Sequence, residues 1–206
     1  ANPNSRFSAS VNLGSSQYYR NSLVQQNLPN TQVNNLSSSI SYSKTFPAYP
    51  SVNMSLTATH NQNTNTDAVD VTLPTFQGSM ERIFPFAKRD GIKKGALQNI
   101  NFQYDVNARN SIKTTSEDFL TGRMFDGSRM GARHRIPLAT NFKIAKYFSV
   151  TAGASYEDVW TWDTYQKRYD ENGTVVTDTI SGFDRFNQYS LNASMGTTLY
   201  GTFNRG

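Results

Sequence analysis

Residues 35–46 read Asn-Leu-Ser-Ser-Ser-Ile-Ser-Tyr-Ser-Lys-Thr-Phe, and this stretch decides the fold class. Its even positions carry mostly large side chains, whereas every odd position is Ser, Asn or Thr. Strict alternation is typical of a β-strand whose two faces meet different surroundings. The same alternation recurs in residues 51–61, 99–108, 148–156 and 189–195. The sequence therefore predicts an all-β protein.

The overall composition also favours strands over helices. Asn, Ser and Thr make up 64 of the 206 residues, and these side chains compete with a helical backbone for its hydrogen bonds. Charged residues are 17% and aromatic residues 13% of the chain, the opposite of the balance found in disordered proteins. The chain has no cysteine, which excludes disulfides, thiolate zinc sites and cysteine nucleophiles.

The chemistry of the polar face indicates which solvent it meets. A soluble surface normally carries about 25–35% charged residues, whereas this face is built from Ser, Asn, Thr, Gln and Gly. Phe148 and Tyr156 bracket a stretch of nine residues, close to the ~9–11 residues of a tilted membrane strand with aromatic rims. We expect a transmembrane β-barrel with apolar side chains toward lipid and polar side chains toward a lumen. The alternative is a secreted soluble β-solenoid or sandwich.

The links between the expected strands alternate in length, as in outer-membrane barrels with short periplasmic turns and longer extracellular loops. The short links are 47–50 and 145–147, with a medium one at 87–95, and the external links are 14–34, 61–67, 110–131 and 165–187. This pattern predicts eight antiparallel, up-and-down strands. They are expected at residues 6–13, 35–46, 51–60, 68–86, 96–109, 133–144, 148–164 and 188–204.

The hairpin registers can be tested on the apolar residues. Pairing Phe46 with Val52 places every apolar residue of that hairpin on one face, and pairing Ile144 with Phe148 does the same for the 145–147 turn. The alternation changes phase at Pro74, which predicts a β-bulge there.

The inward side chains are too small to fill an eight-stranded barrel. The chain also starts at Ala1 and stops at Gly206 without the marks of a complete protein. We therefore expect residues 1–206 to be part of one larger outer-membrane barrel domain, incomplete at both ends.

Several short stretches resemble one family in their order and spacing. They are RFSASVNLGSS (6–16), SISYSKTFP (39–47), NQNTN (61–65), TLPT (72–75), RIFPF (82–86), QNINF (98–102), YEDVW (156–160) and GTTLYGT (196–202). Together they resemble the lipopolysaccharide-assembly outer-membrane protein LptD, in the form found in Bacteroidota, over essentially the whole chain.

The resemblance implies a very large barrel in the cell outer membrane. It implies lipopolysaccharide as the transported molecule, an LptE-like lipoprotein plug in the lumen, and periplasmic components that bring lipopolysaccharide to the barrel. It also implies sideways exit of the lipid between the first and last strands. Neither that seam nor the periplasmic domain of the family is expected within these residues, and the disulfides of enterobacterial members cannot form here. No cofactor is implied.

Four basic residues, Arg109, Arg133, Arg135 and Lys143, fall on the expected luminal face. Guanidinium groups suit bidentate contact with phosphate, so these residues are candidates for contact with lipopolysaccharide or with the plug. Internal pairing is the other interpretation. It expects Arg109 opposite Arg133, and Asp105 diagonal to Arg135 within reach of an ion pair.

Two further groups are candidates. The basic turn Lys88, Arg89, Lys93 and Lys94 is expected to be periplasmic, where it could meet anionic headgroups or the periplasmic domain, or simply be solvated. The aromatic girdle is expected to include Phe46, Phe148, Tyr156, Trp160, Tyr189 and Phe203.

Signals for other functions are weak. Ser38 could face His60, but a hydrolase also needs an orienting group, and serine is abundant in this chain. No metal-ligand cluster or nucleotide-binding motif is present, and the basic residues form no stripe suited to nucleic acid. We expect a non-enzymatic lipopolysaccharide translocon. The alternatives are another outer-membrane transporter or porin, or a structural or adhesion barrel.

Overall fold

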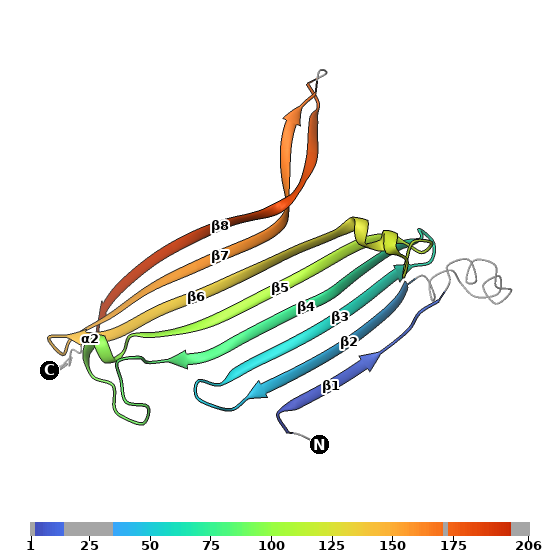
Figure 1. Ribbon diagram of the computed structural model, residues 1–206. Coiled ribbons are helices and arrows are strands. Elements are labelled where there is room, and N and C mark those ends of the chain that lie inside the picture. Colours follow the sequence, from blue (N-terminus) through green and yellow to red (C-terminus); the bar gives the residue numbers. More distant parts are fainter. Residues whose placement is uncertain (1–2, 15–34, 171–172, 199–206) are drawn as a thin grey trace, which may run out of the picture.

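The computed structural model describes residues 3–14, 35–170 and 173–198, and these form one antiparallel sheet (Figure 1). The strands follow one another in chain order from β1 to β8, so the sheet is an up-and-down meander. Their bounds are β1 (Ser5–Ser10), β2 (Asn35–Phe46), β3 (Val52–Asn63), β4 (Ala68–Ile83), β5 (Asn101–Thr115), β6 (Ser128–Ile144), β7 (Phe148–Tyr169) and β8 (Val175–Thr197). The only helices among the described residues are α2 (Gly95–Gln98) and the 3₁₀ helix η2 (Gly122–Gly127). The all-β, up-and-down prediction is confirmed, and the described sheet is open.

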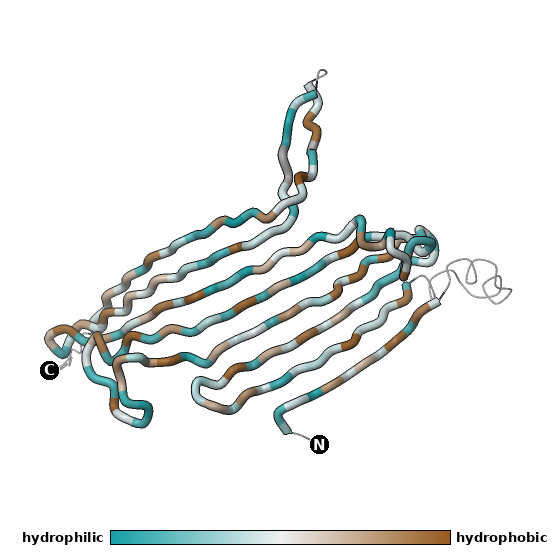
Figure 2. Tube along the Cα trace, viewed as in Figure 1, coloured by the Kyte–Doolittle hydropathy of each residue, from teal (hydrophilic) through white to brown (hydrophobic). Residues whose placement is uncertain are grey.

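The registers of both tested hairpins are confirmed. Phe46 pairs with Val52 in the β2–β3 hairpin, and Ile144 pairs with Phe148 in the β6–β7 hairpin. Because the side-chain period of a strand is two, these registers keep the apolar residues of neighbouring strands on the same face. Figure 2 shows the resulting alternation of hydrophobic and hydrophilic residues along the strands.

The β-bulge predicted at Pro74 is also present. The β3–β4 register shifts between Thr57 and Thr59, and the β4–β5 register shifts between Thr72 and Thr75. Proline has no N–H to donate to a ladder, so an irregularity is the expected way for a paired strand to accommodate it.

Two of the expected long links are wrong. The first link is shorter than expected, residues 116–127, because β5 runs to Thr115 and β6 begins at Ser128. Residues 165–187 are mostly strand, because β7 and β8 meet across residues 170–174. Charged residues in these segments suggested loops, but the β8 extension is rich in β-branched residues, which favour strands. The β4–β5 link is longer than expected and contains α2, which displaces the start of β5 from residue 96 to Asn101.

The β7–β8 pair extends beyond the rest of the sheet. Gly131 of β6 pairs with Thr161, and above that level β7 pairs with β8 alone, from Asp163 to Tyr169. A register irregularity between Thr161 and Asp163 marks the point of departure. Figure 1 shows this two-stranded ribbon rising away from the sheet.

The apolar face of the sheet is largely uncovered. Leu56 is 46% exposed and Leu191 is 85% exposed, while Phe102 and Val150 are only partly buried. A layered soluble fold would bury such a face against a second layer, and the described residues provide none. No helix in the described part of the chain is long and apolar enough to span a membrane.

One corner of the apolar face is covered by protein. Met124 of η2, 5% exposed, packs with Val69, Val71 and Ile112 at the ends of β4 and β5, and Phe119 packs against this cluster. We call this group the η2 cap. It is the small apolar core of the described chain.

Candidate functional site

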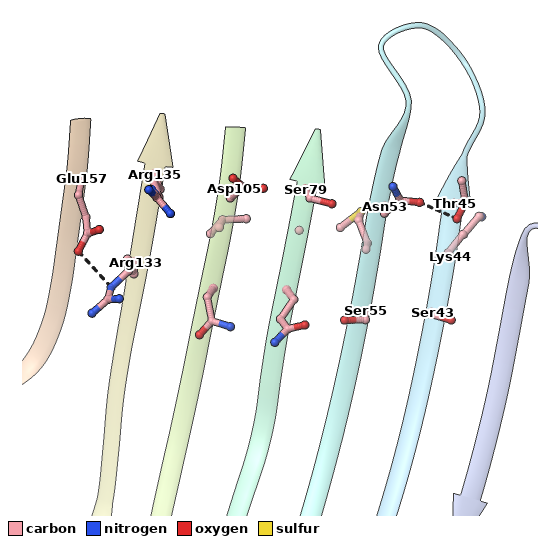
Figure 3. Close-up of a pocket in the computed structure, with 15 residues that line it drawn as sticks. Ser43, Lys44, Thr45, Asn53, Ser55, Ser79, Asp105, Arg133, Arg135 and Glu157 are labelled. Atoms are coloured by element: carbon pink, nitrogen blue, oxygen red, sulfur yellow. Dashed lines mark hydrogen bonds and ion pairs between the residues drawn. The ribbon is translucent and has the colours of Figure 1, made fainter. Parts of the chain in front are cut away.

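The polar face of the sheet is hollowed. A recess of about 580 Å³ extends across β2 to β7, and Figure 3 shows the residues that line it. The side chains on its polar rows come from odd-numbered positions on every strand. They are Ser43, Thr45, Asn53, Ser55, Gln77, Ser79, Asp105, Asn107, Arg133, Arg135 and Glu157.

The strand registers create these rows. Ser43, Ser55, Gln77, Asn107 and Arg133 follow one another across five strands, each paired with the next. Since paired residues on neighbouring strands point to the same side of a sheet, the row continues without a break. The recess is therefore polar because one parity of the sequence is polar in every strand.

Hydrogen bonds between neighbouring strands satisfy part of this face. Thr45 Oγ1 donates to Asn53 Oδ1 at 2.7 Å, and Ser37 Oγ donates to Asn61 Oδ1 at 2.8 Å. These short side chains leave the recess open, so the face can hold water or a polar ligand.

Charges gather at one side of the recess. The Nε atom of Arg133 lies 3.3 Å from Oε1 of Glu157 on β7, as drawn in Figure 3. Arg135 pairs in register with both Asp105 and Glu157, and its exposed guanidinium makes no hydrogen bond or ion pair with a described residue. The cluster combines one paired and one available guanidinium.

The structure corrects the expected pairing of Arg109. Arg109 lies opposite Gly131, and Arg133 lies opposite Asn107, so the β5–β6 register differs by two residues from the expectation. A shift of two keeps the same face, and Arg109 stays on the polar side, where its Nη2 donates to Thr72 Oγ1 at 3.3 Å. The expectation failed because β6 begins five residues earlier than predicted.

The expected Asp105–Arg135 relationship is also different. The two residues lie directly opposite each other instead of diagonally. Gln103, not an arginine, donates to the Asp105 carboxylate, at 3.0 Å. Arg133 has its ion pair with Glu157, an acidic partner on β7 that was not expected from the sequence.

Lys143 lies away from the arginine cluster. It pairs with Ser149 at the end of the sheet that carries the 145–147 turn, and it borders a separate hollow with Lys146 and Tyr147. At ~3.3 Å per residue, Lys143 is roughly 26 Å along the strand from Arg135. The structure thus brings Arg133 and Arg135 together at the recess, while Arg109 and Lys143 lie outside its lining.

The basic turn lies in the β4–β5 link at the same end as Lys143 (Figure 1). Arg89 lies over the ring of Tyr49 at 4.6 Å, and Lys93 lies over the ring of Phe84 at 4.1 Å. Lys88 and Lys94 are exposed. Two of the four cations are therefore held on aromatic rings and two are free to meet solvent or a partner.

A carboxylate at this end joins a strand to a neighbouring turn. The backbone N–H of Ser51, in the β2–β3 turn, donates to Glu81 Oε2 of β4 at 3.0 Å. This hydrogen bond holds the turn against the end of β4.

The aromatic girdle residues lie at two levels of the apolar face. Phe46 and Phe148 begin or end strands beside the short turns. Tyr156, Trp160 and Tyr189 lie toward the other end, where the Tyr156 and Tyr189 rings are 5.1 Å apart and Trp160 lies 4.3 Å from the His134 ring. Phe203 lies outside the described residues.

The arrangement at Ser38 and His60 does not form a catalytic pair. The two residues are in register, but the Ser38 hydroxyl donates to the Asn12 carbonyl at 3.0 Å. The His60 ring stacks on Phe119 at 4.8 Å, and both of its nitrogens are buried without a hydrogen bond to a described residue. No group of three or more potential metal ligands occurs within the described ranges.

Comparison with known protein families places the chain. The family described as LptD protein matches residues 1–206. No curated protein and no solved structure matches the chain. The Bacteroidota form of the family, expected from the sequence, stays a prediction.

Proposed function

Because the chain belongs to the LptD protein family, whose members act in lipopolysaccharide transport and assembly at the outer membrane, we propose that its polar face lines the passage for the lipopolysaccharide sugars. In this proposal the sheet is one part of the wall of a larger barrel domain. The hollowed row from Ser43 to Arg133 is the observation that carries the proposal.

The uncovered apolar face supports the outward half of this arrangement. Side chains such as Leu56 and Leu191 are exposed with no protein layer over them in the described chain. Exposed apolar surface of this extent is stable in contact with hydrocarbon and unstable in water. An apolar exterior and a polar interior are the two properties that a membrane barrel requires.

The transport step needs no bond chemistry. A lipopolysaccharide molecule carries charged sugars that cannot cross hydrocarbon without a large cost. A wet passage accepts the sugars, while the acyl chains leave through a lateral opening between strands outside the described sheet. We accordingly propose a non-enzymatic role, with an LptE-like plug and periplasmic delivery components as partners of the whole protein.

Arg133 and Arg135 are the residues we assign to the passage. Arg135 has a free guanidinium beside the recess, and Arg133 is held by Glu157 at the same level. Phosphate groups of a passing lipopolysaccharide would find a bidentate donor there.

The test uses the full-length protein in cells with Arg133→Gln and Arg135→Gln combined. We expect newly made lipopolysaccharide at the cell surface to fall severalfold while the barrel assembles normally. The matched control is Arg123→Gln with Arg168→Gln, which removes the same charge from two exposed arginines outside the recess. Normal delivery by a normally assembled double variant would contradict the proposed role of these arginines.

A further inference from the structure

The apolar face carries an ion pair between Asp158 and Arg185. Asp158 pairs in register with His134 on one side and Asn187 on the other, and Arg185 pairs with Trp160. The parity of Trp160 and Tyr156 places all of these residues on the apolar side of β6, β7 and β8. Charged residues on a lipid-facing side are costly at the bilayer centre and tolerated near its surface.

The pair is tightly organised. Nη2 of Arg185 lies 2.7 Å from Oδ2 of Asp158, and its Nε donates to Oδ1 at 2.8 Å. Trp160 Nε1 donates to the same carboxylate at 3.1 Å, and Arg185 Nη2 donates to the Tyr156 hydroxyl at 3.0 Å. Asp158 is buried, at 5% exposure. The guanidinium is thereby fixed in a single orientation.

One side of this guanidinium is unused. Half of the Arg185 side-chain surface is exposed, and Nη1 contacts no hydrogen-bond partner among the described residues. The neighbouring Tyr189 is 70% exposed. A fixed cationic donor therefore lies beside an accessible aromatic ring, both facing outward.

Aromatic rings continue on both sides of the pair. His134, Trp160, Phe183 and Trp162 follow one another with ring centroids between 4.3 and 6.1 Å apart. The hydroxyl of Tyr104 lies 2.6 Å from His134 Nδ1. Amphipathic rings of this kind collect at the level of lipid headgroups.

The height of the cluster agrees with that level. Asp158 is ten residues along β7 from Phe148, which is about the length of a strand that crosses the apolar core of a bilayer. The cluster lies toward the end of the sheet from which the β7–β8 ribbon projects (Figure 1). If the short turns are periplasmic, as the link lengths predict, that end faces the cell exterior.

We propose that the outward surface of β7 and β8 around Arg185 and Tyr189 binds the phosphorylated sugar headgroup of lipopolysaccharide in the outer leaflet. Nη1 of Arg185 donates to a headgroup phosphate. The Tyr189 ring packs against a sugar face, and the acyl chains lie along the apolar side chains below. The choice of lipopolysaccharide as the ligand rests on the proposed function. The site itself includes neither Arg133 nor Arg135, so the two proposals can be tested separately.

The test uses the full-length protein in phosphatidylcholine nanodiscs with a small, fixed fraction of lipopolysaccharide. A photo-crosslinking amino acid replaces Asn187, which faces outward between Arg185 and Tyr189, and in a second protein replaces Gln188, which faces the polar side. We expect a lipopolysaccharide adduct at position 187. The double change Asp158→Asn with Arg185→Gln should lower that adduct about tenfold, the scale of one charge-assisted hydrogen bond.

The double variant removes both charges together, so no unpaired charge stays buried. Tyr189→Ala leaves the ion pair in place and should also lower the adduct. The matched control is Arg168→Gln, an exposed arginine paired with Asp178 on the same hairpin but away from the cluster. This control should leave the adduct at position 187 unchanged.

Three results would overturn the inference. The first is an equal adduct yield in the wild type and in the double variant. The second is an equal adduct yield with dephosphorylated lipopolysaccharide, and the third is competition by phosphatidylglycerol as strong as that by lipopolysaccharide. The proposed passage is judged separately, by delivery in the Arg133 and Arg135 variant. If the adduct at position 187 does not respond to the Asp158 and Arg185 changes, but delivery is impaired in the Arg133 and Arg135 variant, then only the site at Arg185 and Tyr189 is rejected.

Discussion

The two faces of the sheet share one backbone ladder and differ in almost everything else. On β7, Ala154 points to the apolar side between Leu138 and Leu191, while the next residue, Ser155, points to the polar side beside Ser190. Many of the apolar side chains are exposed. The polar side chains line a recess and bond to one another across strands.

This difference shows where the stability of such a sheet comes from. Neighbouring strands pair along most of their length, so the backbone needs no second layer to satisfy its hydrogen-bonding groups. The side chains then only have to match the medium on each side. A sheet of this kind is stable when one face meets lipid and the other meets water. Each face should tolerate substitutions that destabilise the protein when they are made on the other face.

The largest effect is expected for a charge placed on the apolar face. Ala154→Arg should destabilise the full-length protein by about 2–4 kcal/mol, because the guanidinium would enter hydrocarbon between the two aromatic levels. Ser155→Arg, at the same height on the other face, should cost little. Urea unfolding of the protein in phospholipid bilayers measures both. Equal costs for the two variants would break the comparison between the faces.

The η2 cap offers a second contrast, because there the apolar face is covered by protein. Met124→Ala should cost about 2 kcal/mol, the lower end of the range for a buried methionine, and should release the local cover. Hydrogen exchange of residues 116–127 is expected to accelerate while β7 and β8 stay protected. Phe125→Ala is the control, since Phe125 is adjacent in η2 and 55% exposed. Unchanged exchange in Met124→Ala would mean that the cap contributes nothing.

The sequence was sufficient to predict the parts of the fold that depend on the alternation of polar and apolar residues. Alternation located β2 at residues 35–46 and fixed its register with β3, because a slip of one residue would have placed Tyr42 and Leu56 on opposite faces. The bulge at Pro74 followed from a change of phase. These features depend on neighbouring residues only.

The parts that failed depend on how far two strands pair and on which side chains meet across them. Extension of β7 and β8 beyond the sheet is stabilised by each strand pairing with the other, which local charge content did not reveal. Arg133 was placed on the correct face, but its partner Glu157 belongs to the next hairpin. The Asp158–Arg185 pair could have been suspected from parity, since an acidic residue and a basic residue both interrupt apolar rows in β7 and β8.

A smaller effect is expected from the ion pair on the polar face. Arg133→Gln and Glu157→Gln, made singly and together, should give a coupling energy of about 0.2–1 kcal/mol, because both side chains reach water. The coupling should weaken as salt is raised. A double-mutant cycle of unfolding free energies measures it. A coupling energy of several kcal/mol would indicate that water does not reach this ion pair, which would contradict a hydrated polar face.

The smallest change in unfolding free energy is expected for a hydrogen bond on the polar face, at the short-turn end of β2. Thr45 Oγ1 donates to Asn53 Oδ1 across the hairpin, and Thr45→Val keeps the shape while removing that donor. Water in the recess can replace the lost partner, so the cost should be below about 0.5 kcal/mol, less than a typical net hydrogen bond. Thr45→Ser, which keeps the hydroxyl, is the control in the same unfolding measurement. A loss above about 2 kcal/mol for Thr45→Val alone would mean that Asn53 is left without a hydrogen-bond donor in a dry site, and the polar face would then be a packed surface instead of a wetted one.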